Sequence, residues 1–349
     1  MRPDFANNRP LIWKTGTGTT PGFGRKQDEK AIGMNEISLE NARVLVVDSQ
    51  LHTRRLLKDA LHMIGFRTID DLGEVRNLEQ AIQRSEPHLI LIDMDEDRDF
   101  LCAALKDLRN DKSGTNPFVT IIALTWQPEE DAVEAVMSAG IDDIVTKPIS
   151  GKILYDRVLN LIERRKDFVV TADYVGPDRR KDCRPVSEND LPTIAVPNSL
   201  RNATAPGSSQ AGSAVVNRAQ ISEAMRMLCA QKVYRLATQM RDVTAELHQR
   251  HKGEPGSPLA DAEAKRLKDM LDEILEIIGT QGLESVTQVA ENTQMVLNTV
   301  LQSVTDVDPQ QLDLLRLHSE AIAVTLRESD EAAGALVSAL NQAAEAVNA

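Results

Sequence analysis

Short apolar runs alternate with amphipathic stretches in the first half of the chain. The runs are rich in Val, Ile and Leu, as expected for strands buried on both faces of a parallel sheet. They cover residues 43–47, 67–70, 88–92, 118–124 and 142–146. Helical spacing of apolar residues is clear in 52–64, 74–85 and 153–162. This alternation predicts an α/β domain whose sheet is covered by helices on both sides.

From residue 218 onward, apolar residues recur only at three- and four-residue steps. The stripes cover residues 221–247, 267–278, 283–304 and 312–326, followed by an Ala-rich stretch at 331–347. Gly279 is expected to end the second helix, and Asp308-Pro309 to begin the fourth as its N-cap and first residue. The pattern predicts an all-α antiparallel bundle of four or five helices.

The remaining segments lack such periodicity. Residues 1–40 are polar and read as a disordered extension, within which Met1 and Met34 both stay open as the start of the chain. Residues 167–217 contain five prolines and read as a linker that contains no regular helix. Within it, Phe168–Val170 and Ile194–Val196 are apolar enough to dock on a neighbouring surface. The expected organisation is therefore 1–40, an α/β domain at 41–166, a linker at 167–217 and a bundle at 218–349.

Charge and composition narrow the function classes. The net charge is −13, and the bundle region holds 12 Lys and Arg against 20 Asp and Glu, which disfavours nucleic-acid and anionic-membrane binding. Cys102, Cys183 and Cys229 are scattered and odd in number, so we expect neither a disulfide framework nor a zinc site. No apolar run is long enough to cross a bilayer. A cytoplasmic protein is expected.

Four polar residues occur where predicted strands end. Asp48, Asp93, Thr125 and Lys147 follow or close the first, third, fourth and fifth strands. Loops at the carboxyl ends of parallel strands meet at one edge of the sheet, so these side chains should converge. Carboxylates that hold Mg²⁺, a lysine ammonium and a hydroxyl are the groups that phosphoryl transfer to an aspartate requires.

The segments Val44–Asp48, Leu89–Asp93, Ile122–Thr125 and Gly140–Pro148 resemble the receiver domain of response regulators, over residues 41–166. The resemblance implies a doubly wound, flavodoxin-like sheet of order 2-1-3-4-5. It implies Asp93 as phosphoacceptor, with Thr125 and Lys147 as the conformational contacts. It further implies Mg²⁺ held by Asp48, Asp93 and the backbone carbonyl of Asp95. A histidine kinase or phosphotransfer protein would donate the phosphoryl group, and the domain would catalyse only its own phosphorylation and dephosphorylation.

The chain departs from the family pattern at several of these positions. Ser49 stands where a second acidic residue is usual, which should weaken Mg²⁺ binding, although the acidic residues after Met94 add charge nearby. Residues 94–98 lack the usual Met-Pro turn. Trp126 replaces a small residue at the entrance, and Ile144 replaces the aromatic residue of the switch. A pseudo-receiver that acts as a phosphorylation-independent scaffold therefore stays open as an alternative.

A basic segment and the histidines of the helical region each allow more than one interpretation. The basic segment Gly176–Arg184 reads as a turn whose arginines pair with acidic surface, and its Arg180 and Arg184 also have the spacing of PilZ-type cyclic-dinucleotide sites. His318 reads as a partly exposed structural histidine, with a phosphorelay intermediate that uses His318 as the alternative. His248 and His251 suit a helix end. Without a DNA-binding or enzymatic motif, the expected output is interaction with an unknown protein target, with self-association of the bundle as a further expectation.

Overall fold

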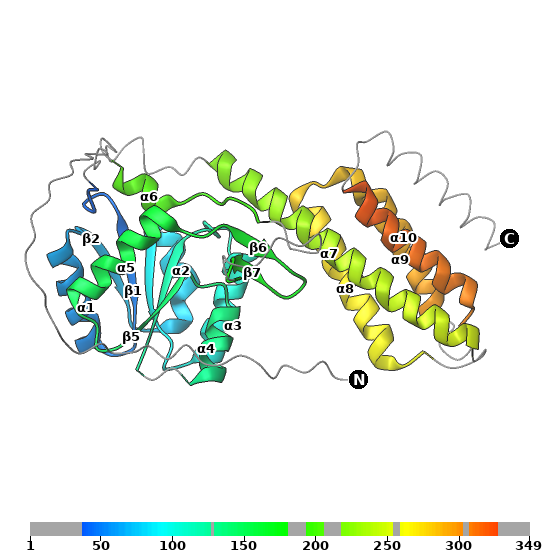
Figure 1. Ribbon diagram of the computed structural model, residues 1–349, viewed down its shortest axis with the longest axis horizontal. Coiled ribbons are helices and arrows are strands. Elements are labelled where there is room, and N and C mark those ends of the chain that lie inside the picture. Colours follow the sequence, from blue (N-terminus) through cyan, green and yellow to red (C-terminus); the bar gives the residue numbers. More distant parts are fainter. Residues whose placement is uncertain are drawn as a thin grey trace, which may run out of the picture. The chain divides into compact units, whose positions relative to one another are not determined.

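The computed structural model describes residues 37–126, 129–180, 193–205, 218–253, 259–302 and 307–326. Its main sheet has five parallel strands in the order β2-β1-β3-β4-β5, as expected (Figure 1). The strands are β1 (Arg43–Val47), β2 (Thr68–Leu72), β3 (Leu89–Asp93), β4 (Thr120–Thr125) and β5 (Asp143–Thr146). The connecting helices are α1 (Leu51–Ile64), η1 (Val75–Asn77), α2 (Leu78–Ser85), α3 (Arg98–Arg109), α4 (Glu130–Ser138) and α5 (Gly151–Arg164).

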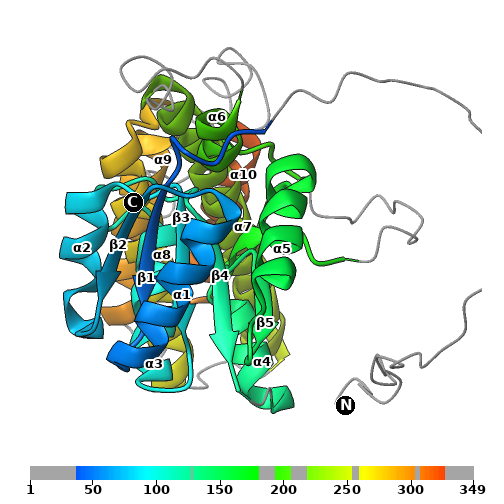
Figure 2. The same ribbon diagram turned by 90° about the vertical axis from the view of Figure 1, so that its left-hand side faces the viewer.

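Alternate residues of the central strands supply two separate cores. Leu89 and Leu91 of β3 pack with α1 and α5, whereas Ile90 and Ile92 pack with α2, α3 and α4. Figure 2 shows α1 and α5 together on one side of the sheet. Because every residue of β3 and β4 is buried, these strands read as continuous apolar runs rather than as alternating ones.

The predicted limits fail mainly at the edge strand. β2 ends at Leu72, two residues after the expected end at Asp70. It contains Asp70 and Asp71, because an edge strand tolerates polar residues that a central strand does not. The helix expected at 74–85 begins with the 3₁₀ turn η1 before α2.

Regular structure lies within the stretch that the sequence suggested was a linker. β6 (Phe168–Val170) and β7 (Val175–Pro177) form an antiparallel hairpin, and Phe168 also pairs with Ile194. The expectation that these two segments dock is confirmed, since Phe168 is fully buried against Phe118. The expectation that no helix forms here is wrong. Helix α6 (Ser199–Thr204) begins at Asn198, whose side chain accepts a hydrogen bond from the Arg201 amide, and it packs on the α1–α5 core.

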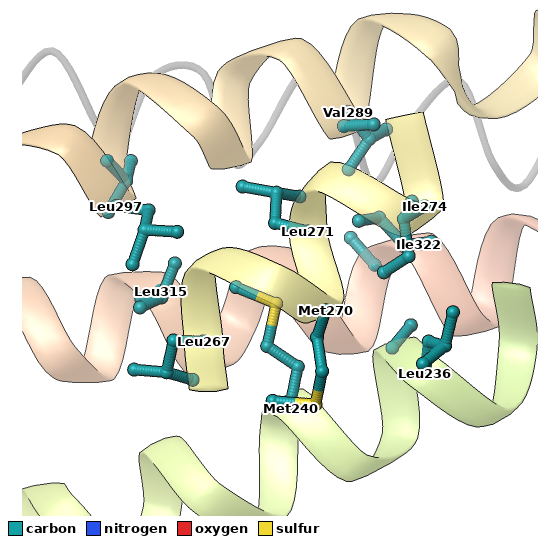
Figure 3. Packing of buried hydrophobic residues seen from close by; sticks show 14 of the residues in the cluster. Leu236, Met240, Leu267, Met270, Leu271, Ile274, Val289, Leu297, Leu315 and Ile322 are labelled. Carbon is teal, nitrogen blue, oxygen red and sulfur yellow. The ribbon is translucent and has the colours of Figure 1, made fainter. Parts of the chain in front are cut away.

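The described part of the second half consists of α7 (Arg218–Gly253), α8 (Asp261–Gln281), α9 (Glu284–Gln302) and α10 (Pro309–Thr325). Their apolar stripes meet in one core, which includes Met240 of α7, Leu271 of α8 and Ile322 of α10 (Figure 3). The Asp308 cap is confirmed, because its side chain accepts a hydrogen bond from the Gln310 amide. The stretch expected as a fifth helix, 331–347, lies outside the described residues.

Gly279 does not end α8. The helix continues to Gln281, and Gly282 adopts the left-handed conformation at its end, with φ of 63°. Of these two glycines, only Gly282 needs the conformational freedom of glycine, since Gly279 is helical. No helix in the described residues is long and apolar enough to cross a membrane.

Candidate functional site

Four side chains converge at the carboxyl edge of the sheet. Asp48, Asp93, Thr125 and Lys147 are all buried, and each comes from the end of a different strand. The pairing register of β3 with β4 and of β4 with β5 brings their ends level, and the Lys147 amide donates a hydrogen bond to the Thr125 carbonyl at 2.7 Å. The prediction that these four residues meet at one edge of the sheet is therefore confirmed.

Lys147 is the centre of the cluster. Its Nζ lies 2.8 Å from Asp93 Oδ1, and 3.5 Å from both Asp48 Oδ2 and Asp95 Oδ2. Burial alone would lower the pKa of Lys147, but the hydrogen bond to Asp93 and the three carboxylate charges outweigh it and raise the pKa. One ammonium thus balances only one of three carboxylates.

The excess negative charge bears on Asp93. Burial raises the pKa of Asp93 to about 6, even though the contact with Lys147 opposes the change, and the charge of Asp48 adds to it. A carboxylate in this position is stabilised by any further cation that enters the cluster.

The side chain of Asp95 takes part in the cluster, in line with the expectation that the acidic residues after Met94 add charge beside the site. Thr125 Oγ1 donates a hydrogen bond of 2.6 Å to Asp95 Oδ1, and the Trp126 amide donates to both carboxylate oxygens, at 3.2 and 3.1 Å. Burial acts to raise the pKa of Asp95, but these donors outweigh it and lower the pKa. The sequence indicated a nearby charge at Asp95 but not its hydrogen bonds with Thr125 and Trp126.

The donor set suits a small divalent cation. Asp48 Oδ2 is buried and has no hydrogen-bond donor, while Oδ1 accepts from the Gln50 amide. No three side chains of His, Cys, Asp or Glu in the described segments form a metal cage by themselves. Mg²⁺ does not need such a cage, because it is commonly held by one or two carboxylates and completes its shell with water. The neighbouring carboxylates of Asp48 and Asp93 fit that mode.

The unusual residues lie around this cluster. Ser49 is exposed and lines a cavity of about 160 Å³ that reaches Asp93. Glu74, Glu96 and Asp97 are among the other residues that line this cavity. Trp126 is 55% exposed and does not line this cavity; its ring centroid lies 5.7 Å from Lys147 Nζ. Ile144 is partly buried and shares a narrow void with Thr125.

A second buried polar cluster was missed by the sequence analysis. Arg109 of α3 and Arg165, just after α5, both contact the Asp142 carboxylate, at 3.0 and 2.8 Å. Arg109 also donates to the carbonyls of Gly140 and Val119, and its guanidinium lies 5.3 Å from the Phe168 ring centroid. Burial lowers the pKa of Arg109 to about 10. The cluster ties the β6–β7 hairpin to the sheet, because both guanidinium groups also lie over the Phe168 ring.

The basic segment is used structurally where it is described. Arg180 pairs with Asp178 of its own turn at 2.8 Å, and Arg179 donates to the Ile141 carbonyl. This agrees with the expected turn of paired arginines. Residues 181–184, and with them the Arg184 half of the PilZ-type spacing, lie outside the described residues.

The histidines of the bundle are packed inside it. His318 is only 1% exposed, so the expectation of a partly exposed residue is wrong; its Nδ1 donates to the Leu314 carbonyl, and burial lowers its pKa. His251 is buried as well, and His248 Nδ1 donates to the Pro309 carbonyl. A phosphotransfer histidine must be reachable by a partner, which His318 in this arrangement is not.

Comparison with known proteins agrees with the geometry of the α/β domain. Residues 44–159 match the family model described as response regulator receiver domain. The chain is 28% identical to a probable chemotaxis protein CheY of Rhizobium etli, over 32% of this chain and 84% of the relative. It is 30% identical to the phosphate regulon transcriptional regulatory protein PhoB of Pseudomonas aeruginosa, over 35% of this chain and about half, 52%, of that protein. A solved structure of chemotaxis protein CheY4 of Vibrio cholerae aligns with 34% of this chain and 97% of its own, with 18% identity and a TM-score of 0.31.

Proposed function

We propose that this chain, in which residues 44–159 form a response regulator receiver domain, is phosphorylated on Asp93 and signals through contacts of its helical bundle with another protein. The proposed organisation is a receiver domain at 41–166, a connecting segment at 167–217 and an output bundle at 218–349, after the extension 1–40.

The observation that carries the proposal is the contact between Lys147 Nζ and Asp93 Oδ1, 2.8 Å long and buried beside Asp48. An oxygen of the Asp93 carboxylate attacks the phosphorus of a donor such as a phosphohistidine. The bond between phosphorus and the donor's nitrogen breaks, the nitrogen keeps the electron pair, and an acyl phosphate forms on Asp93. Lys147 neutralises charge on the transferred group.

Mg²⁺, bound by Asp48, Asp93 and the backbone carbonyl of Asp95, would neutralise the charge of the incoming phosphoryl oxygens. Ser49 contributes no carboxylate, so the affinity for Mg²⁺ is expected to be below that of a site with two acidic residues at positions 48 and 49. Thr125 offers a hydroxyl to a phosphoryl oxygen, and its position reports whether an anion is bound.

We place the protein in the cytoplasm, with a histidine kinase or phosphotransfer protein as phosphoryl donor. The protein has no metabolic enzyme activity and does not bind nucleic acid. Its bundle binds an unknown protein target and provides a surface for self-association. Phosphorylation shifts the receiver between two states that differ in affinity for this target.

Mass spectrometry of the full chain tests the proposal. Incubation with Mg²⁺ and acetyl phosphate should add one phosphoryl group, and Asp93→Asn should abolish the addition. Absence of the adduct, under conditions that label an ordinary receiver, would overturn the proposal.

A phosphorylation-independent scaffold is the second candidate, favoured by the Asp95 carboxylate that already engages Thr125. In that case Asp93→Asn leaves the cellular phenotype and the binding of the target unchanged, whereas a phosphorylation-dependent regulator loses its response.

A further inference from the structure

We propose that the carboxylate of Asp95 is a resident occupant of the anion pocket at the sheet edge, where it holds the place that the phosphoryl group on Asp93 would take. The consequence of this occupancy rests on the proposed phosphorylation of Asp93, whereas the occupancy itself is a property of the unphosphorylated protein.

The pocket is defined by its donors. They are Thr125 Oγ1, the Trp126 amide and Lys147 Nζ, at 2.6, 3.1 and 3.5 Å from the nearest Asp95 oxygen. A hydroxyl, a backbone N–H and an ammonium directed at one point form a site for an oxyanion. In the proposed reaction, Thr125 and Lys147 serve the transferred phosphoryl group. Asp95 therefore uses the same donors.

Hydrogen bonding favours this occupancy in the resting state. Thr125 and the Trp126 amide are donors that need an acceptor, and the Asp95 carboxylate supplies both of its oxygens to them. Hydrogen bonds to a charged acceptor are stronger than those between neutral groups. Asp93 does not replace Asp95 in this role, because its Oδ1 is engaged by Lys147 and by the Asp95 amide.

The partial exposure of the Asp95 side chain allows it to leave the pocket. The Asp95 side chain is 24% exposed, whereas those of Asp93 and Lys147 are 6% and 5% exposed. Asp95 can therefore turn toward solvent while the other two remain in place. The Thr125 hydroxyl has a single O–H, which it now donates to Asp95. A phosphoryl oxygen can therefore accept this hydrogen bond only after the Asp95 carboxylate has moved away.

Two consequences follow. Phosphorylation of Asp93 is slower than in a receiver with an empty pocket, because Asp95 must first be displaced. In addition, Thr125 is already drawn to an anion before phosphorylation, so the resting receiver resembles its own phosphorylated form at this residue. The charge at position 95 thus sets how strongly the domain responds to its kinase.

The first experiment tests occupancy without any phosphoryl donor or Mg²⁺. The amide resonance of Trp126 is recorded by NMR in the full chain, in Asp95→Ala, and in Asp99→Asn as a matched control. Asp99 is exposed and lies in the first turn of α3, so its variant removes a nearby charge. A shift of the Trp126 resonance in Asp95→Ala, absent in Asp99→Asn, supports the occupancy. An unmoved resonance overturns it.

The second experiment measures the initial rate of labelling by acetyl phosphate with Mg²⁺. Asp95→Ala should be labelled roughly tenfold faster than the unmodified chain, the factor expected when one charge-assisted hydrogen bond no longer has to break. Asp95→Asn keeps the shape of the side chain and should fall between them, and Asp99→Asn should equal the unmodified chain. Equal rates for Asp95→Ala and the unmodified chain overturn the competition. If no variant is labelled although the Trp126 resonance shifts, the occupancy is supported and the phosphorylation of Asp93 is overturned.

Discussion

The guanidinium of Arg109 lies 3.0 Å from the carboxylate of Asp142, and each of the two side chains is only 1% exposed. Asp142 also accepts hydrogen bonds from Arg165 and from the Ile121 amide. The Asp142 carboxylate therefore balances the buried guanidinium groups of both Arg109 and Arg165, next to the β6–β7 hairpin.

Asp142→Asn should lower the free energy of unfolding by about 3–5 kcal/mol, because it leaves buried cations without a counter-charge. Urea denaturation of the full chain measures this loss. The neighbouring Asp143→Asn serves as control, since its partner Arg157 is 42% exposed and such a pair contributes about 0–1 kcal/mol. Equal losses in the two variants would contradict the assignment of a special role to Asp142.

Gly140→Ala should destabilise the protein more than Gly114→Ala does. Both glycines have positive φ, of 78° and 64°, so both variants carry the same kind of backbone strain. Only at Gly140 would the new Cβ meet the Val175 carbonyl, at 2.5 Å, and thereby push the β6–β7 hairpin away. Overpacking of this kind costs about 1–3 kcal/mol, which should appear as the difference between the two melting curves. Identical melting temperatures would show that the hairpin adjusts freely.

Asp93→Asn should stabilise the protein in EDTA at pH 7.5. The folded pKa of Asp93, about 6, lies above its ordinary value of 3.8, so the folded state binds the proton more tightly and loses stability as the pH rises from 4 to 6. The cost at pH 7.5 is on the order of 3 kcal/mol, and Asn avoids it. Thermal melts at pH 7.5 and pH 3.5 should show an advantage for the variant only at the higher pH. A variant that melts below the unmodified protein at pH 7.5 would refute the assignment.

His318→Gln should reduce the loss of stability at acid pH. The pH dependence that His318 causes has the opposite sign to that of Asp93. Burial lowers the pKa of His318 below 6.5 in the folded state, so the unfolded state takes up the proton first. The stability that depends on neutral His318 is fully present above pH 6.5 and is lost as the pH falls below it. Urea denaturation at pH 7.5 and 5.5 should therefore show a smaller loss in the variant. The prediction fails if both proteins lose the same free energy.

Ser49→Asp should increase the affinity for Mg²⁺ several-fold. The residue lines the cavity that reaches Asp93, and a carboxylate there adds an anionic oxygen beside Asp48. Calorimetric titration with Mg²⁺ measures the change. Ser113→Asp, on a partly buried turn that precedes β4, controls for the added charge. Equal affinities in the two variants would mean that position 49 does not face the cation.

The strands and the residues at their ends could be read directly from the sequence. The runs at 88–92 and 118–124 are largely apolar because the strands that they form are buried on both faces, and Asp93 and Thr125 follow directly after them. The Asp308 cap was equally readable, because it depends on a hydrogen bond within two residues. The edge strand β2 was less clear, since half of its environment is solvent.

Contacts between distant parts of the chain were decided only by the tertiary structure. Asp95 meets Thr125 across 30 residues, and Arg109 meets Asp142 across 33, with no periodicity to mark either pair. The end of α8 at Gly282 rather than Gly279 likewise depended on which glycine turns left-handed. The sequence by itself therefore determined the sheet and which residues stand at its edge, because those follow from local burial patterns. Which anion faces Thr125 depended on the path of the loop after β3, and that path is set by packing.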